Sequence, residues 1–117
     1  MGRDRVERQR RGKRKPFVLL EKELLMHQNF RRLSAAGKVA FLYLKEQFNG
    51  SNGDDISLPY ASMRDILSRA TLSRAFNELE AAGLIRFVRH GGLRVGGEKN
   101  CNIFALIPWN DVKGLWG

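Results

Sequence analysis

The sequence predicts an α+β fold that is mainly helical, with three to four helices and a two- to three-stranded antiparallel sheet that includes a small β-hairpin. Three observations lead to this prediction. Apolar residues recur at helical spacing through much of residues 20–82, two short alternating segments follow Gly83, and 117 residues suffice for one hydrophobic core. Strands that alternate apolar and polar residues after the last helix are typical of a terminal hairpin.

The first fifteen residues are expected to form a disordered basic tail that precedes the folded domain at residues 16–117. Residues 1–15 contain eight basic and two acidic residues, and Val6 is almost their only apolar side chain. Such a segment cannot bury enough apolar surface to offset the entropy lost on ordering. Pro16 marks the boundary between the tail and the domain.

Two helices are expected in the first half of the domain. Residues 20–30 carry a partial apolar stripe at helical spacing. That stripe consists of Leu20, Leu24 and either Met26 or His27. Ser34 can act as the N-cap of the second helix, whose side chains are apolar on most sides as far as Phe48. A helix that is apolar all round is usually buried, so we expect this one to be the central core helix.

A turn, a short strand and a third helix are expected next. Residues 49–54 are rich in Asn, Gly and Asp, which adopt the backbone angles that turns require. Residues 56–58 alternate apolar, polar and apolar, which predicts a strand. Pro59 suits the first turn of a helix that covers about residues 60–67.

Residues 68–82 carry the clearest helical pattern in the chain. The apolar stripe at positions i, i+4 and i+7 is formed by Leu72, Phe76 and Leu79. Either Ser68 or Thr71 can cap the helix, and Gly83 is expected to end it. The polar residues off the stripe are expected to face solvent, and these are Ser73, Arg74, Asn77 and Glu78.

Two strands are expected after Gly83. Residues 84–90 place Ile85 and Phe87 on one face, and residues 102–107 form a second alternating segment that ends at Pro108. The glycine-rich residues 91–97 between them are expected to be a flexible loop.

Residues 68–85 resemble the recognition helix and the start of the wing in winged helix-turn-helix transcription regulators. In that superfamily a Ser-x-x-Thr-hydrophobic-Ser-Arg segment opens the helix, and a Leu-Glu-x-x-Gly-Leu-Ile segment closes it. Both segments occur here, from Ser68 to Arg74 and from Leu79 to Ile85. The usual glycine turn before the first segment is missing, because residues 65–67 run directly into Ser68. This departure leaves either a tighter turn or a shorter third helix.

The rest of the domain resembles small helix-turn-helix proteins of bacteria, some of which are associated with phages or plasmids. The matching segments are Phe17-Val18, Leu33-Ser34, residues 49–53, residues 56–60 and residues 91–93. Together the two resemblances imply that residues 16–117 form a winged-helix DNA-binding domain.

Charge and residue chemistry also favour double-stranded DNA as the partner. The net charge is +9, and a strongly basic chain favours a polyanion. A helix fits the major groove and presents its N-terminal side chains to base edges, where arginine pairs with guanine and asparagine with adenine. The candidate helix contacts are Ser68, Arg69, Thr71, Ser73, Arg74 and Asn77, and the candidates on or near the wing are Arg86, Arg89, His90 and Arg94. The tail residues Arg8, Arg10, Arg11, Lys13, Arg14 and Lys15 are expected to neutralise phosphates without reading sequence.

The sequence does not predict an enzyme. Residues 91–97 lack the Gly-Lys-Ser/Thr ending of a phosphate-binding loop, and His27 and His90 have no second His or Cys at metal-ligand spacing. We therefore expect no catalytic residue, metal, cofactor or small-molecule ligand. The single cysteine, Cys101, cannot form an intrachain disulfide, and no apolar run is long enough for a membrane span. These features favour a cytoplasmic protein, associated with the nucleoid if it is bacterial.

The sequence favours a duplex DNA-binding protein that acts as a transcriptional regulator or as a replication- or phage-associated factor. Two other functions are compatible with it. A winged-helix protein-interaction module in a larger complex would expose an apolar patch near Leu115 and Trp116. Binding of RNA or single strands is disfavoured because most phenylalanines fall on predicted core faces. A homodimer stays open, since Trp116 can serve either the core or a dimer contact, whereas Trp109 is expected to close the core.

Overall fold

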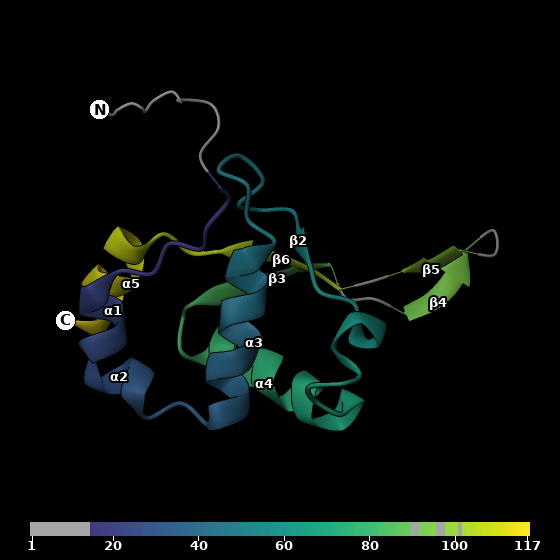
Figure 1. The fold of residues 1–117 in the computed structure, drawn as a ribbon, viewed down its shortest axis with the longest axis horizontal. Coiled ribbons are helices and arrows are strands. Elements are labelled where there is room, and N and C mark those ends of the chain that lie inside the picture. Colours follow the sequence, from purple (N-terminus) through teal and green to yellow (C-terminus); the bar gives the residue numbers. More distant parts are fainter. Residues whose placement is uncertain (1–14, 90–91, 96–97, 101) are drawn as a thin grey trace.

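The computed structural model describes residues 15–89, 92–95, 98–100 and 102–117. The tail predicted for residues 1–15 lies outside this range except for Lys15, as does His90. The α+β class is confirmed, because the chain combines helices with antiparallel strands (Figure 1). In chain order the elements are α1 (Lys22–Met26), α2 (Gln28–Arg31), α3 (Ala35–Glu46), β2 (Ile56–Ser57), the 3-10 helix η2 (Tyr60–Met63), α4 (Arg69–Ala81), β3 (Ile85–Arg89), β4 (Gly92–Val95), β5 (Glu98–Asn100), β6 (Ile103–Leu106) and α5 (Trp109–Trp116).

The first predicted helix is interrupted and consists of α1 and α2. The backbone at His27 is extended, with φ −67° and ψ 139°, so it ends α1 and precedes α2. The His27 Nδ1 atom accepts a hydrogen bond from the Asn29 amide at 3.0 Å and thereby caps α2. Leu24 is buried as the stripe predicts, but the Met26 side chain is 72% exposed.

Helix α3 begins at the predicted cap, because Ser34 Oγ accepts a hydrogen bond from the Gly37 amide at 2.9 Å. Its buried face consists of Gly37, Ala40, Phe41 and Leu44. The expectation that this helix is buried on most sides is wrong, since Leu42 and Tyr43 are exposed. The helix contributes one face to the core, packs against α4 and presents its other face to solvent.

The predicted strands pair into one antiparallel sheet with the order β2-β6-β3. Phe104 in the central strand β6 stands opposite both Ile56 of β2 and Phe87 of β3. The Phe76 ring of α4 lies 4.5 Å from the Phe104 ring, measured between centroids, so the helical layer and the sheet share one core.

The structure describes two strands between β3 and β6 where the sequence predicts a loop. Gly92–Val95, inside the predicted loop, form β4, which pairs antiparallel with β5, and the two strands form a ribbon that projects from one end of the three-stranded sheet (Figure 1). The many glycines indicate a loop because glycine is disfavoured in strands, but a hairpin can continue where the partner strand supplies backbone hydrogen bonds.

Helix α5 is absent from the sequence prediction, and it packs against the hydrophobic core after the last strand of the sheet. Its Val112 side chain is buried, and both of its tryptophans pack against the core. Trp109 therefore closes the core as expected. Trp116 does so too, because its Nε1 donates a hydrogen bond to the Ala82 carbonyl at 2.7 Å and its ring lies 4.7 Å from that of His27.

Candidate nucleic-acid interface

The N-terminus of α4 is fixed by Ser68. This residue has an extended backbone, and its Oγ accepts a hydrogen bond from the Thr71 amide at 3.2 Å. Ser68 is thus the N-cap, which decides between the two candidates that the sequence offers. The Ser68 hydroxyl also donates to Thr71 Oγ1 at 2.9 Å, and Arg74 Nη2 donates to that same oxygen at 3.4 Å. The side chains of three predicted DNA contacts therefore meet at the N-terminal end of α4.

A short turn leads into α4 where a longer helix was expected. The 3-10 helix η2 ends at Met63, and the Met63 carbonyl then accepts hydrogen bonds from the amides of Ile66 (2.8 Å) and Leu67 (2.9 Å). The prediction of a helix over residues 60–67 is therefore too long. Of the two alternatives left by the missing glycine, the structure has the shorter third helix, and the buried Met63 side chain anchors it.

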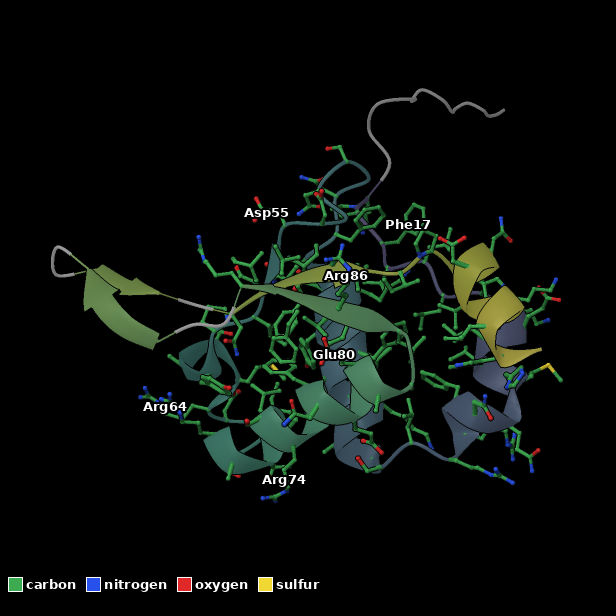
Figure 2. The ribbon with its side chains drawn as sticks, turned by 180° about the vertical axis from the view of Figure 1, so that it is seen from behind. Phe17, Asp55, Arg64, Arg74, Glu80 and Arg86 are labelled. Carbon is green, nitrogen blue, oxygen red and sulfur yellow. The ribbon has the colours of Figure 1, made fainter. Side chains whose placement is uncertain are left out.

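The rotation of α4 about its axis follows the predicted stripe. Leu72, Phe76 and Leu79 are fully buried, and they turn the opposite side of the helix outward. Arg69, Arg74 and Asn77 are exposed, whereas Thr71 and Ser73 are half-buried. Figure 2 shows Arg74 at the edge of the molecule, with its side chain directed away from the body.

The α5 tryptophans leave this surface open. They contact Glu23 of α1, His27 between α1 and α2, and the Ala82 carbonyl just beyond the C-terminal end of α4, far from its first turn.

Arg69 is held by an aromatic ring that the sequence analysis did not single out. Its guanidinium carbon lies 4.5 Å from the centroid of the Tyr60 ring, which is a cation–π arrangement. The Tyr60 hydroxyl accepts a hydrogen bond from Asn102 Nδ2 at 3.3 Å, and its ring lies 6.0 Å from that of Phe76. Tyr60 thus positions Arg69 against the core. The available signal was an aromatic residue directly after Pro59, at the start of the helical turn before α4.

The two carboxylates of α4 are directed at the chain's own backbone and do not lie among its arginines. Glu78 was expected to face solvent, but it accepts hydrogen bonds from the Ser34 amide at 2.9 Å and the Ser34 hydroxyl at 2.7 Å. Glu80 accepts from the Phe87 amide at 3.0 Å on β3. These bonds fix α4 to the start of α3 and to the sheet, so the exposed face of α4 is rigidly supported.

The remaining candidates do not all gather around α4. Arg86 and Arg89 are exposed on β3, and Figure 2 shows Arg86 over the sheet, well away from Arg74. Arg64 is exposed in the turn before α4 and lies along the same edge as Arg74, although the sequence analysis did not place it in the site. Arg94 belongs to β4 of the projecting ribbon.

Lys15 is the first described residue and is exposed. The other predicted contacts lie outside the described residues, and these are His90, Arg8, Arg10, Arg11, Lys13 and Arg14. In the ranges that the structure does describe, no three His, Cys, Asp or Glu side chains are grouped as metal ligands would be. Within those same ranges, no helix has the length and apolar character needed to cross a bilayer.

No family model, curated protein or solved structure matches this chain. Function is therefore argued from the geometry and chemistry of the site itself.

Proposed function

We propose that this chain binds double-stranded DNA, with α4 in the major groove and with the β3–β6 hairpin and the basic tail on the backbone. The observation that carries the proposal is the outward face of α4, where Arg74 and Asn77 stand exposed on a helix whose other face is fully buried, with Arg69 exposed at the first position of the helix. The protein would act in the cytoplasm as a transcriptional regulator or a replication- or phage-associated factor.

Each exposed side chain has a role that suits its position. Arg74 and Asn77 lie one turn apart on α4 and can pair bidentately with guanine and adenine edges, respectively. Arg69 stands at the N-terminus, where the Tyr60 ring limits the orientations of its guanidinium. Arg64, just before α4, is placed to contact the phosphate backbone.

Electrostatics also supports the proposal. The tail carries +6 of the net +9 and would attract DNA regardless of its sequence. The basic residues on or near the wing would add to this attraction, and these are Arg86, Arg89, His90 and Arg94. Contacts to base edges from α4 would then supply the specificity.

Selection of bound duplexes from a random pool tests the proposal directly, and the winning sequence then serves for variants. Arg74→Ala and Asn77→Ala are each expected to weaken binding to the preferred site by about 1–3 kcal/mol and to spare binding to unrelated duplexes. Arg32→Ala, which removes an exposed arginine at the end of α2, is the matched control and should leave specificity unchanged. Equal losses on every sequence from the α4 variants would contradict base readout.

The alternative of a protein-interaction module has less support. Its expected apolar patch near Leu115 and Trp116 is reduced to Leu115, because Trp116 packs against His27. Single-strand or RNA binding needs exposed aromatic rings beside basic groups. Of the exposed phenylalanine rings, Phe17 lies at the opposite edge of the molecule from Arg74 (Figure 2), and Phe48 lies beside a single lysine, Lys45, at 5.9 Å from its ring centroid. Competition between duplex, single strands and RNA at fixed salt separates these functions.

A further inference from the structure

An open groove of about 1130 Å³ lies at the C-terminal end of α3, in a part of the molecule that the proposed DNA contacts do not use. One wall is the non-helical segment of residues 16–19, here called the strap. Phe48, just after α3, and Trp109, at the start of α5, also line the groove. Phe17, Leu19 and Phe48 are 66%, 58% and 41% exposed. Large apolar side chains gathered around a hollow are typical of an interaction surface.

Among the residues that the structure describes, the charges around this groove cancel. The charged lining residues there are Lys15, Glu21, Lys45 and Glu46, two of each sign, whereas the whole chain carries +9. A neutral apolar groove that includes two carboxylates does not attract a polyanion such as DNA, nor does it favour a strongly charged protein segment. The groove therefore suits an apolar segment that is flanked by both basic and acidic residues and has no net charge.

We propose that the groove binds a second copy of this chain, with the strap of each copy lying in the groove of the other. The strap is itself apolar and exposed, and it is bordered by Lys15 and Glu21. The strap of one copy therefore has the apolar and charged groups that the groove of another copy requires. A two-fold contact brings the same patch together from both copies, which lets a lysine of one meet a glutamate of the other.

The position of the groove decides what such a pair could do. Helix α3 has 12 residues and is therefore about 18 Å long. Glu78 fixes α4 to Ser34 at one end of α3, whereas the groove begins at Lys45 near the other end. Figure 2 accordingly shows Phe17 and Arg74 at opposite edges of the molecule. Pairing through the groove leaves both α4 helices uncovered and facing away from each other.

This arrangement, which rests on the proposed function, suits the bridging of two duplex segments. Dimers that read one palindromic site hold their recognition helices about one helical turn of DNA apart on the same side. Helices on opposite outer edges of a pair cannot meet that spacing. The pair would instead hold two duplexes, or two distant segments of one duplex, at the same time.

Sedimentation velocity of the full chain over a concentration series tests the pairing without DNA. The wild type is expected to form a concentration-dependent dimer. Phe17→Asp should raise the dissociation constant by at least about tenfold, because it places a charge in the apolar contact. Met26→Asp is the matched control, since it changes a more exposed apolar side chain on α1 that does not line the groove, and should leave the dimer intact. A wild type that stays monomeric, or equal losses in both variants, would overturn the proposal.

A charge exchange at the groove provides an independent test. Lys45→Glu gives a net charge of −2 around the groove and Glu46→Lys gives +2, so each variant alone should dimerise more weakly than the wild type. An equimolar mixture of the two variants should recover pairing as a heterodimer, because their grooves carry opposite net charges. Failure of the mixture to recover would refute a self-complementary contact, and so would capture of an apolar additive by a chain that stays monomeric.

Energy transfer between two differently labelled duplexes tests the bridging. The wild type is expected to bring the duplexes together, whereas Phe17→Asp should still bind each duplex but lose the transfer. A dimer that binds no duplex would refute the proposed function and leave the pairing intact. A monomer that binds duplex would refute the pairing alone, so the two failures are distinguishable.

Discussion

At the scale of single residues, Tyr60 connects the core to the proposed DNA contact of Arg69. The cation–π distance of 4.5 Å and the hydrogen bond from Asn102 hold the ring in place beneath the guanidinium. Tyr60→Leu keeps an apolar side chain and removes the cation–π contact. We expect duplex affinity to fall by about 0.5–1 kcal/mol, because Arg69 loses its fixed orientation.

A double-mutant cycle separates this positioning effect from general damage to the fold. In the Arg69→Ala background, Tyr60→Leu should cause no further loss of affinity, because the arginine that it positions is already absent. Additive losses in the double variant would show that Tyr60 acts independently of Arg69.

The hydrogen bonds from Ser34 to the Glu78 carboxylate, here called the clamp, hold α4 against the start of α3, and Gly37 leaves room for them. A Cβ atom at this position would overlap the Glu78 carboxylate that binds Ser34. Although alanine is the better helix former, we expect Gly37→Ala to lower the free energy of unfolding by about 1 kcal/mol or more, because the charge-assisted hydrogen bonds are displaced.

Gly114 provides the control for that substitution. It lies in α5, and a Cβ there meets nothing within 4 Å. Gly114→Ala should therefore stabilise the protein by up to about 1 kcal/mol through helix propensity alone. Urea unfolding of both variants measures the difference, and equal effects of the same sign would contradict the clamp.

At the scale of the elements, the contact between α5 and α1 is expected to respond to acid. Hydrogen bonding from the Trp109 indole, followed by the hydrogen bond and charge of Lys113, holds the pKa of Glu23 below its usual value. A carboxylate with a lowered folded-state pKa stabilises the protein above its unfolded-state pKa, and this stabilisation is lost as the pH falls through the folded-state value. Glu23→Gln should therefore flatten the acid side of the unfolding profile, with a small amplitude because the group is exposed.

The helices and strands differ in how far the sequence predicted them. The cap at Ser34, the stripe of α4, the end of that helix at Gly83 with φ 84° and the three strands of the sheet follow from local patterns, and all are confirmed. The break at His27 and the helix α5 depend on distant contacts. His27 packs on Trp116, which is 89 positions away in the chain, and an eight-residue helix such as α5 gains most of its stability from packing.

The candidate site shows the same division between local and distant information. Periodicity placed Arg74 and Asn77 outward because the helix period fixes which side is buried. It could not reveal that Glu78 binds Ser34, 44 residues earlier, or that Tyr60 lies against Arg69. Those pairs depend on how α3, η2 and α4 pack, which no local pattern encodes.

At the scale of the whole molecule, the proposed function assigns affinity and specificity for DNA to different regions. The tail carries +6 with eight basic residues, while the outward face of α4 carries the side chains suited to base edges. Replacing Arg8, Arg10 and Arg11 together with serine should weaken binding about equally on all duplexes. It should also reduce the slope of log affinity against log salt by up to about 2.7, since each released phosphate contact contributes roughly 0.9.

Comparison with Arg74→Ala separates the role of the tail from that of α4. That variant removes one cation from α4, so its salt slope should change by no more than about 0.9, yet its loss should fall mainly on the preferred sequence. Titrations of both variants against the preferred and an unrelated duplex, at several salt concentrations, measure the two effects separately. If the tail variant loses affinity only for the preferred site, the tail takes part in reading sequence, and the division of roles between tail and α4 is wrong.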